Sequence, residues 1–369
     1  MFVGLLLMAA LVLVALVLGG DPGRIAEELA SADLRIIALV VGLYLANTLM
    51  KVVRWYVLLR EPGHPVPFTK VGNYFLIGLA VNNSLPGHIA GEPVRAYLLK
   101  RSHDYPMGRA MASIFLEKTI DTIVTIMLAL AGVLLLVGVL EEDLTNALLL
   151  STGIIAVLMA VLIAFVAYPS GPRRLSAWAF RKLRNWWAED RVARYEGIVG
   201  GFLGSFEEGT RSISHDRSRA AVATALTVVI WLNEALRLWL VFLALGTDIA
   251  AELALVAATL SSFASLLVPI GAGNSATIAV ICGLAGVDAG VAASASLLHI
   301  MTSVWISAPM GVGAMAYEGV RGAELLGSVR AIDGGGGGRS GGGGRSGGGG
   351  SSGSGGGDGC EVGTASPPG

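Results

Sequence analysis

The sequence has few charged residues and almost no cysteine, and each of these shortages excludes a class of protein for this chain. Only 14% of its 369 residues are charged, 54% are hydrophobic and the mean hydropathy is +0.68, whereas soluble globular chains have about 25% charged residues. The formal net charge of -1 offers no basic surface to nucleic acid. Of the two cysteines, Cys282 lies in an apolar stretch and Cys360 in the glycine-rich tail, so neither a disulfide framework nor a cysteine metal site is expected.

The common catalytic motifs are missing as well. The sequence has no Ser/His/Asp order, no HExxH, no paired cysteines and no GxxxxGK[ST] phosphate-binding loop. We therefore predict no catalytic residue, no metal site, no cofactor and no ATPase in this chain.

Long hydrophobic runs are abundant, and they predict an all-α, polytopic integral membrane helical bundle in the cell (plasma) membrane. A helix needs about 20 apolar residues to cross the hydrocarbon core. Six runs are long enough: 1–19, 34–59, 109–140, 147–168, 219–245 and 289–317. The first run has no basic flank and no Ala-x-Ala pattern, so we interpret it as a span, with a cleaved signal peptide as the alternative.

Two further apolar stretches are too short to cross, and each is interrupted. Residues 71–85 stop at Pro86-Gly87, and residues 253–268 stop at a Pro269-to-Gly273 break before the chain resumes to Gly286. Such broken segments predict re-entrant hairpins that enter and leave on one side. The alternative is six plain spans with two short buried loops.

The loop charges predict the orientation. Residues 95–109 and 169–218 hold four and nine Lys/Arg, whereas 140–146 and 246–252 hold none. Because basic loops stay cytoplasmic, both termini and the opening of the first hairpin are predicted inside, and the second hairpin opens from outside. Span, hairpin and span then recur at 34–140 and 219–317 in opposite orientation, which is the inverted repeat of secondary transporters.

The predicted domain organisation follows from these elements. Residues 1–33 form the first helix and an external loop, 34–168 the first repeat, and 219–330 the second repeat. Residues 169–218 mix aromatic and basic side chains, such as Trp178 and Arg181, and predict one amphipathic helix on the cytoplasmic surface. Residues 331–369 are a Gly/Ser-rich tail that we expect to be disordered.

Charged residues inside the predicted spans are candidate functional groups, because an unpaired charge at a helix centre costs at least about 2.5–3.5 kcal/mol. Lys51 and Arg54 lie at overlapping depths with Glu117 and Asp121, so we expect these charges to pair inside the bundle. They form either an ion-pair staple or part of a substrate path. A similar cluster in the other repeat contains Asn233, Glu234 and Arg237.

The first hairpin carries its own candidate site. After Pro86-Gly87, a new helix would begin near Gly91 at membrane depth, and its free N–H groups would attract an anion. Glu92 and Arg95 lie three residues apart and are expected to pair on one helix face. A purely structural hairpin with a capped helix is the alternative. In the last span, His299 is either a proton relay or a hydrogen-bonded residue of the bundle.

The stretch SLPGHIAGEPVRAYLLKR, the following LEKTIDTI and the Arg54-Trp55 pair resemble the lysylphosphatidylglycerol synthase transmembrane region, also called the flippase-like or UPF0104 family. The resemblance covers about residues 34–317. It implies a bundle with two hairpins that translocates aminoacylated phosphatidylglycerol or another lipid-linked substrate. The matching positions that it implies for substrate binding are Arg54, Pro86, Gly87, Gly91, Glu92, Arg95, Glu117 and Asp121.

The second hairpin departs from that family pattern. VPIGAGNSATIAV keeps Gly271 and Gly273 but has Asn274 and its neighbours where the family usually places a Glu. His299 stands where an Arg is common. The chain shows no soluble aminoacyl-transferase or glycosyltransferase domain, so we do not expect a complete lipid-aminoacylating enzyme.

These observations predict a membrane lipid translocase whose partners are membrane lipids, either anionic phospholipid or polyprenyl-linked substrate, and not nucleic acid. Arg54 and Arg95 would neutralise phosphate, with both hairpins contributing through Gly91, Gly271, Gly273 and Asn274. Further relay or pairing residues would be Lys51, Glu234, Arg237 and His299. The alternatives are a membrane-embedded lipid-modifying transferase, with Glu92 or Asp121 as base, and a non-transporting scaffold of envelope-lipid assembly. Nothing in the sequence indicates the oligomeric state.

Overall fold

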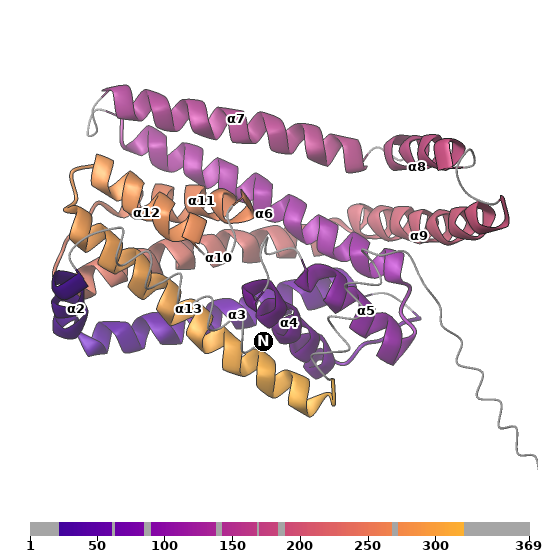
Figure 1. Ribbon diagram of the computed structural model, residues 1–369, viewed down its shortest axis with the longest axis horizontal. Coiled ribbons are helices and arrows are strands. Elements are labelled where there is room, and N and C mark those ends of the chain that lie inside the picture. Colours follow the sequence, from indigo (N-terminus) through magenta and orange to yellow (C-terminus); the bar gives the residue numbers. More distant parts are fainter. Residues whose placement is uncertain are drawn as a thin grey trace, which may run out of the picture.

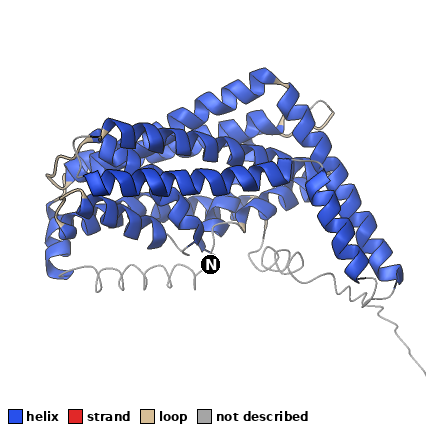
Figure 2. Cartoon of the chain, turned by 90° about the horizontal axis from the view of Figure 1, so that it is seen from above, coloured by secondary structure: helices blue, strands red, loops and turns tan. Residues whose placement is uncertain are grey.

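The computed structural model describes residues 22–60, 63–84, 90–137, 142–167, 170–183, 189–267 and 272–320. Within these residues the chain forms helices joined by short loops, and none of them forms a strand (Figure 2). The all-α prediction is confirmed for them. The predicted first span and the glycine-rich tail lie outside this set, so what was predicted for them stays a prediction.

The described residues form twelve helices: α2 (Pro22–Ser31), α3 (Leu34–Leu59), α4 (Phe68–Ser84), α5 (Gly91–His103), α6 (Met107–Leu135), α7 (Glu142–Ala167), α8 (Ser170–Leu183), α9 (Glu189–His215), α10 (Arg217–Ala244), α11 (Ala251–Leu267), α12 (Ala272–Leu284) and α13 (Ala289–Tyr317). Among them, α3, α6, α10 and α13 are long and apolar enough to cross a membrane. The prediction of a polytopic membrane bundle is confirmed, and α3 and α13 have the predicted bounds.

Helix α3 shows how a span sorts its side chains. Asp33 caps its N-terminus by accepting a hydrogen bond from Arg35 N at 2.8 Å. One face exposes leucines, with Leu45 at 43% and Leu49 at 55%. The buried residues recur at three- and four-residue spacing and include Tyr44, Asn47, Thr48, Arg54, Trp55 and Leu58. The apolar face suits contact with lipid, so the polar stripe must lie inside the bundle.

Helices α3 and α10 lie side by side and antiparallel through the bundle (Figure 1). At one end, Asp33 N donates to Ala244 O at 2.9 Å. At the other end, the Arg219 guanidinium donates to the carbonyl oxygen of Arg60. The long helices α6 and α13 flank this pair and contact it.

The first hairpin, α4 and α5, has its base at the end of the bundle where α3 and α13 finish (Figure 1). Lys70 Nζ and Asn73 Nδ2, near the start of α4, donate to the Glu318 carboxylate at 2.8 and 2.7 Å. The hydrogen bond to Glu318 raises the pKa of Lys70. Tyr105 OH, just after α5, donates to Leu59 O at 3.2 Å. The base of this hairpin is therefore tied to the ends of both long helices.

The second hairpin, α11 and α12, has its base at the opposite end, directly after α10 (Figure 1). It packs against α6, where a Cβ on Gly132 would lie 2.7 Å from Val256 Cγ2. The first hairpin packs in the same way against α13, where a Cβ on Gly311 would collide with Ala80 of α4. Each hairpin thus lies against the long helix that follows the other hairpin, and glycine allows the close approach.

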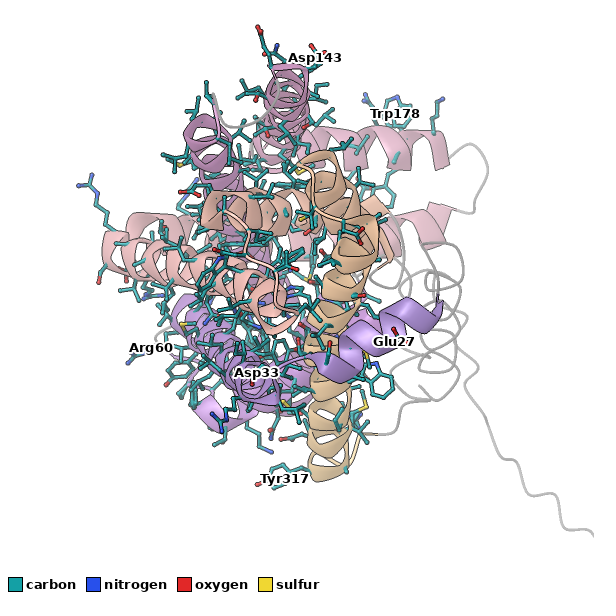
Figure 3. All side chains as sticks on the ribbon, turned by 90° about the vertical axis from the view of Figure 1, so that its left-hand side faces the viewer. Glu27, Asp33, Arg60, Asp143, Trp178 and Tyr317 are labelled. Atoms are coloured by element: carbon teal, nitrogen blue, oxygen red, sulfur yellow. The ribbon has the colours of Figure 1, made fainter. Side chains whose placement is uncertain are left out.

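The segment 169–218 differs from the predicted single amphipathic surface helix. Its described residues form two helices, α8 and α9, and α9 packs along α6. A Cβ on Gly108 of α6 would meet Phe202 O of α9 at 2.5 Å, and Arg109 Nη2 binds Glu208 Oε2 at 2.9 Å. Helix packing through small residues leaves no signal in a hydropathy profile, which explains the error. Trp178 of α8 is 50% exposed and points away from the bundle in Figure 3.

Candidate functional site

Two arginines hold matching places on the central antiparallel pair. Arg54 and Arg237 each lie twenty residues after the first residue of α3 and α10, respectively. Both are buried, with 1% and 0% exposure. On the flanking helices, Glu117 and His299 each lie ten residues after the first residue of α6 and α13. A polar cluster forms around each arginine, and both clusters contain candidates from the sequence.

The first cluster joins α3 to α6 through Arg54. Its Nη2 donates to Glu117 Oε1 at 2.9 Å and to Asp121 Oδ2 at 3.0 Å, and its Nη1 lies 2.5 Å from Asp121 Oδ1. Thr227 Oγ1 of α10 accepts from Nη1 at 2.9 Å, and Trp231 Nε1 donates to Asp121 Oδ1 at 3.3 Å. The predicted pairing of Arg54 with the α6 carboxylates is present in this geometry.

Arg95 of the first hairpin joins the same cluster from α5. Its Nη1 donates to Glu117 Oε2 at 3.3 Å. Its guanidinium carbon lies 4.7 Å from the ring centroid of Trp55 and 5.1 Å from that of Phe75. Aromatic faces stabilise a desolvated guanidinium at such distances. Trp55 is in turn fixed by a hydrogen bond from its Nε1 to Ser113 Oγ at 3.2 Å.

Glu92 pairs with α6, and not with Arg95 as predicted. Lys118 Nζ lies 3.1 Å from Glu92 Oε1, and Asn82 Nδ2 donates to both Glu92 oxygens at 3.2 Å. The three-residue spacing describes α5 alone, whereas α6 supplies Glu117 and Lys118 as competing partners. Two ion pairs therefore link the hairpin to α6. In one the hairpin supplies the cation, Arg95, and in the other α6 supplies it, Lys118.

Glycine makes this hairpin compact. A Cβ on Gly91 would collide with the carbonyl of Gly78, and a Cβ on Gly78 would lie 2.5 Å from Arg95 Cγ. Gly91 N also donates to Asn82 Oδ1 at 2.6 Å, so a side chain satisfies one donor at the start of α5. The predicted site residues Pro86 and Gly87 lie outside the described residues.

The second cluster surrounds Glu234 of α10. Arg237 Nη1 donates to its two oxygens at 3.1 and 3.0 Å, and His299 Nε2 lies 3.2 Å from Oε1. Asn47 Nδ2 of α3 donates to Glu234 Oε2 at 3.2 Å and to Asn233 Oδ1 at 3.0 Å. The cluster predicted from the sequence is thus assembled, and His299 belongs to it.

Arg237 extends this cluster to α13 and α3. Its Nη2 donates to Ser303 Oγ at 2.7 Å and to Thr302 Oγ1 at 3.4 Å. Its guanidinium carbon lies 4.8 Å from the ring centroid of Tyr44. Ser303 and Asp121 have matching positions, because each lies fourteen residues after the start of its long helix. The matching arginines therefore bind matching positions with different side chains.

Lys51 lies between the two clusters and differs from the prediction. It was expected to pair with the α6 carboxylates, but Arg54 takes both of them. Lys51 instead interacts electrostatically, at longer range, with both Glu234 and Asp121. Among the described residues, no carboxylate lies within ion-pair distance of its ammonium, and no hydrogen-bond partner is present for it.

The second hairpin contributes less to these contacts. Asn274 lies in the first turns of α12, and its buried Oδ1 has no hydrogen-bond partner among the described residues. Gly273 lies in the first turn of the same helix. Gly271 falls outside the described residues. The contacts of this hairpin with the two clusters therefore stay a prediction.

Several polar side chains of the clusters were not anticipated. The sequence signal for them is spacing: Thr227 and Trp231 precede Glu234 by seven and three residues and so share its helix face. Tyr44 precedes Asn47 by three residues on the inner stripe of α3. No group of three or more His, Cys, Asp or Glu in the described residues has a geometry that would hold a metal ion. The clusters consist of paired charges.

The comparisons with known proteins agree with this architecture. The family described as "Lysylphosphatidylglycerol synthase TM region" matches residues 1–311. A UPF0104 membrane protein of Methanothermobacter thermautotrophicus is 29% identical over 334 residues, which cover 87% of this chain and 97% of the relative. A UPF0104 membrane protein of Pyrococcus horikoshii is 24% identical over 303 residues, or 78% of this chain and 88% of that protein.

A third relative is larger than this chain. The glycosyltransferase AglD of Haloferax volcanii is 25% identical over 270 residues, which cover 66% of this chain and 41% of AglD. No solved structure matches. The extent of the family match, over more than half of the chain, identifies this polytopic membrane protein as a member of the lysylphosphatidylglycerol synthase transmembrane-region family.

Proposed function

We propose that the protein moves a lipid with a charged headgroup between the two leaflets of the cell membrane. The observation that carries this proposal is the run of buried charged side chains along the bundle, from Glu92 at the first hairpin to Arg237 and His299 in the second half. Charges inside membrane segments are costly and mark substrate or ion pathways.

The carboxylates favour transport over chemistry. A general base needs a free lone pair directed at its substrate. Asp121 accepts hydrogen bonds from Arg54 and Trp231, and Glu92 accepts from Lys118 and Asn82. Carboxylates that already accept these hydrogen bonds have fewer lone pairs to offer a substrate proton. This argues against the alternative of a lipid-modifying transferase that uses Glu92 or Asp121 as its base.

The matching halves support an alternating mechanism. The two hairpins have their bases at opposite ends of the bundle, and the matching arginines lie on antiparallel helices. In transporters with inverted repeats, the substrate site lies near the midplane where the halves meet, and rocking of one half opens each side in turn. We propose that the headgroup crosses at this boundary, between the clusters of Arg54 and Arg237. Loop charge predicts that the first hairpin opens on the cytoplasmic side.

The relatives define the lipids to be tested. Membership in a family named for lysylphosphatidylglycerol synthase supports phosphatidylglycerol and its lysyl ester as candidates. The match to a protein named as a glycosyltransferase supports lipids that carry a sugar. We propose that the substrate is anionic phospholipid or a polyprenyl-linked headgroup.

The test is a leaflet-resolved assay in liposomes that contain the purified full chain. Fluorescent phosphatidylglycerol, its lysyl ester, a polyprenyl phosphate sugar and phosphatidylcholine are offered in turn, and the accessible fraction is followed by quenching from outside. Mass spectrometry of the recovered lipid separates movement from modification. We expect movement without a change in mass, and slower movement in Arg54→Gln than in Arg217→Gln, a control that removes an exposed arginine from the same bundle. Equal rates in liposomes with and without protein would refute the proposal.

A further inference from the structure

A cavity opens at the end of the bundle where α3 ends and α10 begins. Its volume is about 680 Å³, and it is lined by the last turn of α3, the loop after it and the first turns of α10. Loop charge predicts that this end faces the cytoplasm. No residue of the two polar clusters is among the described residues that line the cavity, so the cavity is separate from them.

The wall of the cavity is part apolar and part cationic. Val66 and Val222 supply apolar surface, and Arg60, His64 and Arg219 supply groups that bind anions. A soluble anion would be bound by the cationic part alone. The headgroup of a phospholipid, together with the start of its acyl chains, presents both kinds of surface and therefore matches the whole wall.

Arg60 is the cation of this wall that is available to a ligand. Arg219 binds Asp216 Oδ2 through Nε at 2.6 Å and donates to the carbonyl oxygen of Arg60. The Arg60 guanidinium carbon lies 5.8 Å from the ring centroid of Tyr56 and has no carboxylate or hydrogen-bond acceptor among the described residues, which exclude Glu61. The Arg60 side chain is exposed and lies at the edge of the bundle in Figure 3. A cation in this position attracts anionic lipid.

An exposed apolar track leads away from the cavity along α10. Val222, Val229 and Leu236 are all exposed and lie seven residues apart, so they share one helix face. At about 1.5 Å per residue, Leu236 lies about 21 Å beyond Val222, more than the roughly 15 Å of hydrocarbon in one leaflet. On α3, the exposed Leu49 lies seven residues before Tyr56 of the cavity wall. Acyl chains can lie along these faces while their headgroup occupies the cavity.

We propose that this cavity binds the headgroup of a phospholipid with net negative charge, in the leaflet on its side of the membrane. The phosphate accepts a charge-assisted hydrogen bond from the Arg60 guanidinium, and the acyl chains contact the exposed faces of α3 and α10. Phosphatidylcholine binds more weakly, because its choline cation is repelled by Arg60 and Arg219. The inference does not depend on the proposed lipid movement, since a lipid bound here need not cross the membrane.

The experiment is photolabelling of the full chain in phosphatidylcholine nanodiscs that contain a trace of photoactivatable phosphatidylglycerol. Mass spectrometry identifies the labelled peptides, and at trace concentration the labelling is proportional to affinity. We expect label on the end of α3 and the first turns of α10. Arg60→Gln should lower this labelling about tenfold, or about 1.4 kcal/mol, the lower end for a hydrogen bond to a charged group. Arg217→Gln removes an exposed arginine that does not line the cavity and should leave the labelling unchanged.

A second variant separates binding from folding. Ser218 is exposed, lines the cavity and lies in the first turn of α10. An aspartate there interacts favourably with the helix N-terminus, so Ser218→Asp should keep or raise the melting temperature and still weaken the labelling. Equal labelling in Arg60→Gln, Ser218→Asp and the wild type would overturn the inference, as would equally strong labelling by photoactivatable phosphatidylcholine. Displacement of the label by soluble glycerol 3-phosphate as readily as by phosphatidylglycerol would show a site for soluble phosphate and also overturn it.

Discussion

Replacing Arg54 with glutamine removes the guanidinium that ties α3 to two carboxylates of α6, and the structure indicates how much stability this costs. Glu117 keeps a cation after the change, because Arg95 Nη1 lies 3.3 Å from its Oε2. Asp121 loses its contacts at 2.5 and 3.0 Å and keeps only the neutral donor Trp231 at 3.3 Å. One buried carboxylate, and not two, is therefore left without a direct partner.

The magnitude follows from that count. Breaking a buried ion pair by removing one partner costs about 3–5 kcal/mol, because the other charge stays buried and uncompensated. We expect the lower end, about 3 kcal/mol, since the Asp121 side chain is 20% exposed. Asp121→Asn alone should cost less, about 1–2 kcal/mol, because Arg54 retains Glu117 and Thr227. Adding Asp121→Asn to the Arg54 variant should recover most of the loss.

The assay is the free energy of unfolding in mixed detergent micelles, measured for the two single variants, the double variant and Arg217→Gln. The exposed Arg217 control should stay within about 0.5 kcal/mol of the wild type. A cost below about 1 kcal/mol for the Arg54 variant would contradict the reasoning, as the pair would then contribute no more than a surface ion pair. The same conclusion would follow if Asp121→Asn failed to stabilise the Arg54 variant.

Three further predictions address the hairpin, its cation and the topology. Gly91→Ala should destabilise the protein by about 1–3 kcal/mol in the same unfolding assay, because the new Cβ would collide with a carbonyl of α4. Gly42→Ala is the control: its Cβ would meet open space, so the change should be neutral or slightly stabilising. Arg95→Lys should slow lipid movement in liposomes while the fold is retained, because an ammonium cannot reproduce the planar contact of the guanidinium with two aromatic rings. An unchanged rate would show that this hairpin is not part of the lipid pathway. Asp143→Cys, in a chain without its two native cysteines, should react with an impermeant thiol reagent from outside only, and reaction from inside only would reverse the assigned orientation.

The sequence predicted the helices well, but only some of the side-chain partners were predicted correctly. The apolar run 34–59 coincides with α3, because helix length and membrane thickness depend on the same local composition. That cations of α3 would meet carboxylates of α6 was predictable, since depth along two neighbouring spans limits the choice of partner. The pairing of Glu92 was not predictable, because a spacing within one helix carries no information about what a third helix brings beside it.

The same reason explains what was missed about Lys51 and α9. Whether Lys51 or Arg54 takes a carboxylate depends on rotation and register of α3 against α6, and a shift of one turn would exchange them. Helix α9 packs on α6 at Gly108. The sequence does not distinguish a glycine that faces lipid from one that faces another helix backbone. Contacts between helices require three-dimensional information that no periodicity contains.

The separation of opposite charges on different helices has a consequence for biosynthesis. Helix α3 carries the cations Lys51 and Arg54, and the acids that meet Arg54 are made 63 and 67 residues later, as Glu117 and Asp121. On insertion scales each cation costs about 2.5–3.5 kcal/mol at a helix centre. During synthesis, α3 alone should therefore partition poorly from the translocon into the bilayer. It should stay at the translocon until α6 emerges, so that the two helices partition into the membrane together with their charges already matched.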